Sequence, residues 1–493
     1  MLTILTTTNH QHKLESIIQS IHRLDELVQV VTDAKKVQAT SKAIVVENNS
    51  IVKPLDWYDS EPPYIIPSQE FTTNNVLALV FYSLGNHQKA FEYLTEKDAL
   101  YHDLLIATYI QIGYEITEEL QAAAKLSKHN TCILHHYGNY ANRLSLEALK
   151  VSYEEAIEAA EHDELKIFTA KHYVNLLMDV HEFGKAVTLI RSLSPHAISE
   201  EAKNAMHVQL ATALMQQLQM PFNTDDLKEI QELFQKGIDF YTKKRLFVNA
   251  GLLLIDASEI ANYQQDYITS KNYINQAIQY FKQEDVPEFL GEAGLRKATL
   301  LYTWSKNGQP QYYKPAINAF QDTLKVFKRD THPQKFADIH HNMALIYSEI
   351  PVSPEEKPMW TAFCASSFKE ALAFYTKDKY PYEYAMVSHN YATALINFPE
   401  AKLHNNFDKA HGLFEEALQI RTAETYPFER ASTLLNQLEL YWLLHNETDT
   451  DAQKRFEEME RKINEIKTLI NDSKMLEKAA FHETKLQSLK TVL

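Results

Sequence analysis

A proline-led repeat in the second half of the chain constrains the fold more than any other feature. The repeat begins at four prolines, spaced 46, 48 and 46 residues apart: Pro287, Pro333, Pro381 and Pro427. A polar residue follows nine positions after each proline: Arg296, Asn342, Asn390 and Asn436. A phenylalanine recurs with a similar period: Phe320, Phe368 and Phe414. Such a period is typical of stacked helical hairpins, because one hairpin alone cannot bury its apolar side.

The composition agrees with a helical protein. Only 10 of the 493 residues are glycine, whereas 45% are hydrophobic. Glycine supplies the positive φ angles and close backbone approaches that phosphate-binding loops and many tight turns need. We therefore expect an all-α fold.

The charge of the chain excludes some classes of partner. Its net charge of −16 argues against nucleic acid, because binding along phosphates needs a face rich in lysine and arginine. The acidic balance fits a solvated, self-repelling surface, or alternatively an acidic groove for a basic partner. With two cysteines, no signal-peptide pattern and no long apolar run, the sequence favours a cytoplasmic protein without a membrane span.

We divide the chain into five segments: 1–50, 51–70, 71–284, 285–445 and 446–493. The first contains β-prone runs at 2–7, 28–31 and 43–46 around a helical stretch near 10–26. These runs predict a small α/β cap, with an irregular pair of amphipathic helices as the alternative.

Three of the other segments carry the repeats and the end of the chain. Weaker, degenerate hairpins extend over 71–284, and the long-period repeats occupy 285–445. Charged sequence with sparse apolar positions follows at 446–493. A terminal helix with one face in water needs that pattern, so we expect C-terminal capping helices, with a coiled-coil dimer contact as the alternative.

Segment 51–70 differs in composition from its neighbours. It contains four prolines: Pro54, Pro62, Pro63 and Pro67. Clustered prolines remove backbone donors and favour extended or turn geometry. We expect a linker, or a strap along the surface, at a domain boundary.

The repeats resemble the tetratricopeptide (TPR) family. The residues of its hairpin pattern recur near the start of the helical region: Ala78, Phe81, Gly85 and Ala90. The units after 285 are similar to a longer variant, in which a proline is followed by an alanine and an Asn-Leu-Ala-x-x-Tyr-like segment: Pro333, Ala337, Asn342, Ala344 and Tyr347. That variant is found in bacterial proteins alongside caspase-like CHAT protease domains, and it is more distantly similar to kinesin light chain repeats. The resemblance implies a right-handed α-solenoid that binds proteins; no CHAT domain is visible in this chain.

The recurring polar positions are the candidate binding residues. In TPR arrays the first helix of each hairpin lines the inner face, so equivalent residues form a ladder. An asparagine there could hold an extended peptide through both its carbonyl and its amide. The alternative is that these asparagines bridge neighbouring helices inside the protein. Our candidates for partner contact are the ladder and two adjacent histidines: Arg296, His341, Asn342, His389, Asn390 and Asn436.

Nothing in the sequence indicates an enzyme. It contains no nucleophile elbow, P-loop or dinucleotide-binding motif, and the first 70 residues contain no glycine. The histidine pairs lack the three- or four-residue spacing that puts two ligands on one helix face, so we expect no metal and no cofactor. The sequence thus predicts a non-enzymatic scaffold that holds a peptide or helix of another protein, which could be a separately encoded protease or signalling protein. The alternative is an enzyme or signalling subunit whose activity lies in the N-terminal α/β segment and whose repeats select the substrate.

Overall fold

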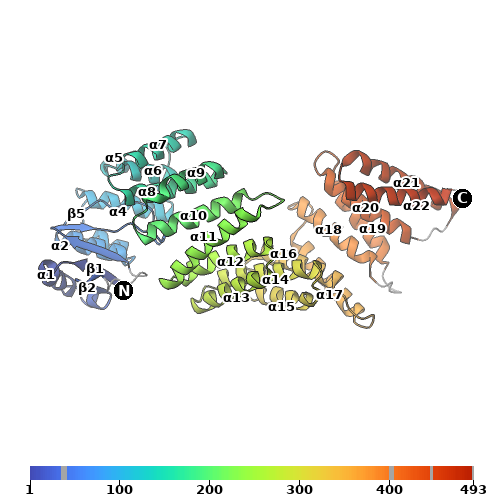
Figure 1. Ribbon diagram of the computed structural model, residues 1–493, viewed down its shortest axis with the longest axis horizontal. Helices are drawn as coiled ribbons and strands as arrows, with labels where there is room; N and C mark the ends of the chain where they lie inside the picture. The colour runs from blue at the N-terminus through green and yellow to red at the C-terminus, as the bar shows by residue number, and fades with distance from the viewer. Residues whose placement is uncertain (35–41, 399–404, 445–447, 491–493) are drawn as a thin grey trace. The chain divides into compact units, whose positions relative to one another are not determined.

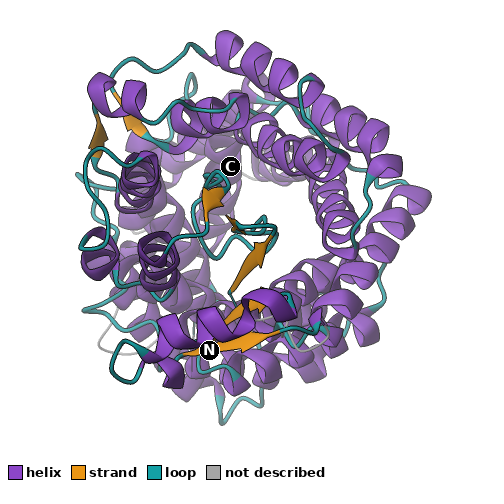
Figure 2. Cartoon of the chain, turned by 90° about the vertical axis from the view of Figure 1, so that its left-hand side faces the viewer, coloured by secondary structure: helices purple, strands orange, loops and turns teal. Residues whose placement is uncertain are grey.

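The computed structural model describes residues 1–34, 42–398, 405–444 and 448–490 (Figure 1). The chain divides into two compact units, Met1–Glu284 and Asp285–Leu493, here called unit 1 and unit 2. Helices make up most of both units, and strands are few (Figure 2). The predicted class, a solenoid of TPR-like helical hairpins with a small N-terminal cap, is confirmed.

Unit 1 begins with an α/β cap, as the strand-prone runs predict. Five strands form one sheet in the order β2-β1-β3-β4-β5: β1 (Leu2–Thr6), β2 (Val28–Val31), β3 (Ala43–Glu47), β4 (Ser50–Val52) and β5 (Gln69–Glu70). β1 pairs in parallel with β2 and β3, whereas β4 and β5 add antiparallel. Helix α1 (Thr8–Gln19) connects β1 to β2, and a short 3-10 helix (Leu24–Glu26) follows it. The alternative of an irregular helix pair is therefore wrong.

The two faces of the sheet have different environments, because successive side chains of a strand point to opposite sides. Ile4 of β1 and Ile44 of β3 are paired in register and lie in the hydrophobic core with Leu14 of α1. The next register pair, Leu5 and Val45, belongs to the other face and is only half-buried. That second face is the floor of a cavity described below.

The proline-rich segment is part of unit 1 rather than a boundary between domains. Its ends are strands β4 and β5, and the residues between them, 53–68, are here called the strap. Tyr64 and Ile66 of the strap are buried in the core of the unit. The sequence suggested a linker at this place because prolines and aspartates break regular structure; the contacts that anchor the strap come from residues far along the chain.

The rest of unit 1 consists mainly of helices, and helices that follow one another in the sequence pack together. Its helices are α2 (Thr73–Ser83), α3 (His87–Phe91), α4 (Ala99–Ile112), α5 (Glu118–Ala123), α6 (Lys128–Tyr137), α7 (Leu146–Glu158), α8 (Asp163–Asp179), α9 (Phe183–Leu193), α10 (Glu200–Gln217), α11 (Thr224–Lys243), α12 (Phe247–Tyr263) and α13 (Tyr267–Gln283), with a 3-10 turn at Ser194–His196. Gly85 has a φ of 81° in the turn between α2 and α3, a conformation that glycine adopts without strain. Two short strands, β6 (Glu115–Ile116) and β7 (Asn139–Tyr140), form a small parallel pair that the sequence did not indicate.

Unit 2 contains the long-period repeats and the last helices. Its helices are α14 (Pro287–Lys306), α15 (Tyr313–Thr323), α16 (Pro333–Glu349), α17 (Lys357–Phe374), α18 (Pro381–Ile396), α19 (Asn406–Ile420), α20 (Pro427–Leu443), α21 (Asp449–Leu469) and α22 (Ser473–Lys490), with a 3-10 turn at Pro310–Tyr312. Each repeat proline is the first residue of a helix, where the missing N–H group costs no hydrogen bond. In the part of the chain that the structure describes, no helix is both long and apolar enough to span a bilayer.

The residues that recur with the period form the core of unit 2. The three phenylalanines of the second helices are fully buried: Phe320, Phe368 and Phe414. At the end of the unit, Ile463 and Ile466 of α21 pack in one cluster with Leu438 of α20. The predicted boundary near residue 446 lies outside the described residues.

Candidate functional site

The predicted asparagine ladder lies on the first helices of the repeats in unit 2, and two of its three asparagines bond to neighbouring helices. Asn390 Nδ2 of α18 donates to His341 Nε2 of α16 at 2.9 Å. Asn436 Nδ2 of α20 donates to Thr393 Oγ1 of α18 at 2.9 Å and lies 3.3 Å from His389 Nε2. Asn342 Nδ2 instead donates to the Asp338 carbonyl oxygen of its own helix at 2.9 Å.

The two histidines beside the ladder are enclosed. His341 is 6% exposed and His389 is 9% exposed. Burial lowers the pKa of His341 to about 4 and that of His389 to about 3, so both rings are neutral at pH 7. Arg296 occupies the equivalent position on α14 and is half-buried. These positions agree with the alternative interpretation, in which the ladder bridges helices inside the protein.

We expect the double variant Asn390→Ala/Asn436→Ala to lower the free energy of unfolding by roughly 2–4 kcal/mol, because each change leaves a buried acceptor without its donor. Urea denaturation followed by circular dichroism measures the change. The matched control is Asn342→Ala, whose side chain bonds only within its own helix, and we expect it to cost less than about 1 kcal/mol. A double variant as stable as wild type would contradict the bridging role.

A different asparagine, in unit 1, does hold an extended chain through both of its polar atoms. The Ile65 N–H donates to Asn130 Oδ1 at 2.9 Å, and Asn130 Nδ2 donates to the Ile65 carbonyl oxygen at 2.8 Å. The neighbouring His129 Nε2 donates to the Pro63 carbonyl oxygen at 3.0 Å. Residues 63–65 belong to the strap, and both gripping side chains belong to α6. Helix α6, the first helix of its hairpin, therefore binds a proline-containing segment of the chain itself.

Further contacts join the strap to three more helices, α4, α8 and α10. Tyr64 OH donates to Asp103 Oδ1 of α4 at 2.6 Å. Asp59 pairs with Lys171 Nζ of α8 at 2.6 Å, and the Trp57 ring lies edge-on to Phe168, with ring centroids 5.3 Å apart. Tyr58 OH donates to Glu201 Oε1 of α10 at 3.2 Å. The N-terminal part of the strap thus contacts α8 and α10, and its C-terminal part contacts α6 and α4.

A hollow of about 310 Å³ lies on α6, α8 and α10, and we call it the amide hollow. Its lining residues are Tyr137, Val174, Asn175, Met178, Asp179, Gln209 and Thr212. Gln209 Nε2 donates to Asn175 Oδ1 at 2.9 Å, and Asn175 Nδ2 donates to Tyr137 OH at 3.3 Å. Within the described part of the chain, the buried Gln209 Oε1 has no hydrogen-bond partner. The hollow therefore combines two amides with an unused acceptor.

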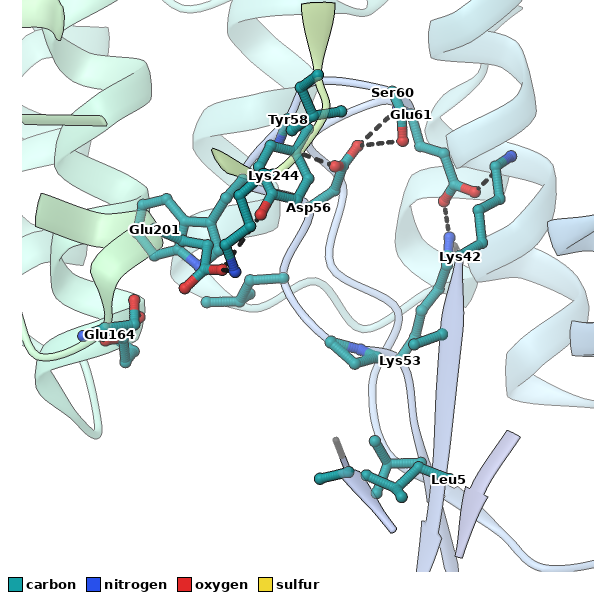
Figure 3. A pocket seen from close by; sticks show the side chains of 18 residues that line it. Leu5, Lys42, Lys53, Asp56, Tyr58, Ser60, Glu61, Glu164, Glu201 and Lys244 are labelled. Atoms are coloured by element: carbon teal, nitrogen blue, oxygen red, sulfur yellow. Dashed lines mark hydrogen bonds and ion pairs between the residues drawn. The ribbon is translucent and has the colours of Figure 1, made fainter. Parts of the chain in front are cut away.

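A larger cavity, of about 610 Å³, lies against the second face of the sheet, and we call it the sheet cavity (Figure 3). Its lining includes strands β1 and β3, the strap, and residues of α8, α10 and the α11–α12 turn: Leu5, Ala34, Lys42, Ala43, Val45, Lys53, Pro54, Leu55, Asp56, Trp57, Tyr58, Ser60, Glu61, Glu164, Ser199, Glu201, Lys244 and Leu246. All of these residues belong to unit 1.

Two charged groups of side chains face each other across the sheet cavity (Figure 3). On the sheet side, Lys42 Nζ lies 2.9 Å from Glu61 Oε1, and Lys53 pairs with the other oxygen of the same carboxylate. On the helical side, Lys244 Nζ lies 2.7 Å from Glu201 Oε1. Burial, with a smaller contribution from the Lys42 charge, lowers the pKa of Lys53 to about 8.

Several polar groups of this lining already have hydrogen-bond partners. Asp56 accepts hydrogen bonds from the Tyr58 and Glu61 amides, and Glu164 accepts from the Ser199 amide, so these carboxylates are already engaged. Burial raises the pKa of the Tyr58 hydroxyl, which stays protonated at pH 7. Among the described residues, no group of three or more histidine, cysteine or acidic side chains is placed to hold a metal ion.

The sequence analysis did not indicate that Asn130 holds Ile65, here called the Asn130 clamp, and it did not indicate the amide hollow or the sheet cavity. Asn130 has no equivalent at the repeat interval, so the period that indicated the ladder could not indicate it. The one available signal was the strap itself, where Trp57, Tyr58 and Tyr64 interrupt a run of prolines and acidic residues. Large aromatic side chains in a linker-like segment suggest that the segment packs against something.

No family model matches the chain, and no curated protein sequence matches it. Among solved structures, the chain is similar to the human IFIT1 dimer with PPP-AAAA, with a TM-score of 0.40 and 12% identity over 85% of this chain and 90% of that chain. It is also similar to Naa15/Naa10 bound to HypK-THB, with a TM-score of 0.38 and 12% identity over 85% and 76%. For yeast Tom70 the TM-score is 0.21, with 12% identity over 84% and 96%. Likenesses of this size carry no conclusion about function.

Proposed function

We propose that the chain is a non-enzymatic, cytoplasmic scaffold that holds an extended segment of a partner protein in the amide hollow of unit 1. The observation that carries the proposal is the Asn130 clamp on Ile65. An extended chain presents one donor and one acceptor per residue, and a carboxamide can satisfy both at once. The same side of the same helices therefore has the chemistry that holding an extended backbone requires.

The amide hollow lies beside the strap and further along the same helices. In α8 the strap contacts Phe168 and Lys171, whereas the hollow uses Asn175 and Met178, one to two turns later. In α10 the strap contacts Glu201, and the hollow uses residues from 209 onward. A partner segment in the hollow would lie next to the strap without displacing it.

The amides of the hollow are arranged to receive a backbone. Asn175 and Gln209 already bond to each other, which restrains both side chains before a partner arrives. The buried Gln209 Oε1 has no partner among the described residues, and it can accept from a backbone N–H of the incoming segment once the side chain turns toward the hollow. Restraint of this kind reduces the entropy lost on binding. Asp179, whose side chain is 73% exposed, adds negative charge at the edge and favours a segment with a nearby basic residue.

The class of partner follows from the charge and from the resemblance of the repeats. A chain with a net charge of −16 is a poor match for nucleic acid, so we propose a protein partner. Because the C-terminal repeats resemble those found with CHAT proteases, a separately encoded protease or signalling protein is the partner class that we would test first.

Site-specific photocrosslinking tests where the partner binds. The photoreactive residue p-benzoylphenylalanine replaces Met178 in the amide hollow or, as a control, Lys325 on the surface of unit 2. In extract from the native cells, we expect a protein crosslinked from position 178 and absent from position 325. Mass spectrometry of the crosslinked peptide then identifies the bound segment, which can be synthesised.

Calorimetric titration of that synthetic segment measures the contribution of the two amides. We expect Asn175→Ala/Gln209→Ala to weaken binding by about tenfold or more, equivalent to about 1.4 kcal/mol, because backbone hydrogen bonds are lost. Asn342→Ala in unit 2, for which we expect little loss of stability, is the amide control and should bind as wild type does. Equal affinity for wild type and the unit 1 variant, or a loss confined to the unit 2 variant, would refute the proposed location.

A further inference from the structure

The sheet cavity has an apolar body that the proposed peptide site does not use. Leu5 and Val45 of the uncovered sheet face form its floor, Trp57 of the strap forms a wall, and Leu246 closes it from the helical side. Its volume of about 610 Å³ lies within the range of cavities that bind small organic molecules, about 300–1,000 Å³. No residue of this cavity lines the amide hollow. The two sites can therefore be tested independently.

The charges at the edge of the sheet cavity differ in exposure. The Lys42 side chain is 42% exposed and the Lys244 side chain 31%, whereas Glu61 is 12% and Glu201 25% exposed. In each pair the lysine side chain is thus more exposed to solvent than the glutamate side chain.

Hydrogen-bonding capacity also favours an anionic ligand. Lys42 and Lys53 share the single carboxylate of Glu61, although each ammonium group has three N–H donors. The carboxylates nearby are better satisfied. Asp56 accepts from two backbone amides and from Ser60 Oγ, and Glu164 accepts from both the amide and the hydroxyl of Ser199. Among the residues that the structure describes, the unused capacity on the sheet side therefore consists of donors.

We infer that the sheet cavity binds a small amphipathic carboxylic acid, whose apolar body packs on Leu5, Val45 and Trp57 and whose carboxylate pairs with Lys42 and Lys53. Apolar burial supplies most of the affinity, and the two lysines select for the charge. The same chemistry occurs in a free aromatic or aliphatic acid and in the C-terminal residue of a peptide. We assign the cavity to the free acid. The apolar body of such an acid can fill the floor between the two charged groups of side chains without a peptide attached to it.

Isothermal titration of the full-length chain with a matched pair of probes tests this inference. The probes are 1-naphthaleneacetate and 1-naphthaleneacetamide, which share the ring and differ in charge. We expect one molecule of the acetate to bind per chain, with the acetamide at least about tenfold weaker. Absence of binding, or equal affinity for the two probes, would overturn the inference.

Variants locate the bound acid. Lys42→Gln should weaken binding of the acetate by about tenfold, and Leu246→Trp, which fills the cavity, should abolish it. Lys325→Gln on the surface of unit 2 is the charge-matched control, and Asn175→Ala/Gln209→Ala leaves the sheet cavity intact; both should bind as wild type does. Each variant is first shown to have the wild-type thermal transition. Unchanged affinity in both Lys42→Gln and Leu246→Trp would place the acid elsewhere.

A third probe separates the two sources of the carboxylate. Acetyl-Gly-Gly-Trp, with a free C-terminus, presents an aromatic body and a carboxylate on a peptide. Affinity for this tripeptide below that for naphthaleneacetate supports the free acid. Affinity more than about tenfold higher would overturn that assignment and make the cavity a site for a peptide C-terminus.

Discussion

Acidification from pH 7 to about pH 4 is expected to unfold this protein, because burial keeps several of its histidines in the neutral form. Four of the buried histidines have a strongly lowered pKa, two in each unit: His129, His172, His341 and His389. Burial lowers the pKa of His129 and His341 to about 4 and that of His389 to about 3, and it lowers the pKa of His172 far below its usual value of 6.5. In the unfolded chain these rings titrate near 6.5.

The sign of the effect follows from proton binding. Above about pH 6.5 both states are neutral at these rings and stability does not depend on them. Between about pH 6.5 and the folded pKa, the unfolded state binds more protons, so stability falls as the pH falls. His129, His341 and His389 then each cost the folded state roughly 3 kcal/mol at pH 4. Burial raises the pKa of Asp103 to about 6, which offsets about 2 kcal/mol in the opposite direction, so the histidines dominate.

Thermal unfolding between pH 7.5 and pH 4.5 measures this dependence. The variant His341→Gln/His389→Gln removes the two titrating rings of the ladder while keeping an acceptor for each asparagine. We expect its melting temperature to depend less steeply on pH than that of wild type. A wild-type melting temperature that is constant across this range, or identical slopes for the two proteins, would contradict the prediction.

Replacement of Phe368 by alanine is the point mutation with the largest expected effect. Phe368 lies on α17, is fully buried and stacks on Tyr391 of the next repeat, with ring centroids 4.8 Å apart. Phe368→Ala therefore removes a contact between repeats and leaves a cavity in the core. We expect the free energy of unfolding to fall by roughly 3–5 kcal/mol. Urea denaturation measures the change.

The control for Phe368→Ala is Phe428→Ala in the same unit. Phe428 follows the repeat proline at the start of α20 and is 53% exposed. Its loss should change the free energy of unfolding by no more than about 0.5 kcal/mol, as is usual for a surface substitution. If the two variants were equally stable, the recurring phenylalanines would not be the core residues that their burial indicates.

The repeat period predicted the helices and the core residues of the long-period repeats, because a residue that recurs at the same place in each hairpin has the same burial in each. The four prolines begin four helices, and the three recurring phenylalanines are buried, because every repeat must solve the same packing problem. The strand-prone runs at 2–7, 28–31 and 43–46 likewise became β1, β2 and β3. In these segments the local sequence preference and the tertiary packing favour the same secondary structure.

The candidate site was harder to predict, for a physical reason that the ladder illustrates. The sequence placed Asn342, Asn390 and Asn436 at equivalent positions, which the structure reproduces. Whether an amide on a helix bonds to a ligand or to a neighbouring helix depends on the rotation of that helix, and periodicity does not determine the rotation. The histidine that receives the Asn390 amide is 49 residues away in the chain. A single sequence contains no signal for that pairing.

The strap has a consequence for how unit 1 is made. Its bonds join residues 65 and 130, 59 and 171, and 58 and 201, which are separated by 65, 112 and 143 positions. On the ribosome, an N-terminal strap must wait for each of these helices to emerge in turn, so its anchoring proceeds stepwise with translation. Ordering of long loops of this kind is entropically costly and slow compared with hairpin formation. The strap is therefore fully anchored only after α10 has been made, more than 130 residues after its own synthesis.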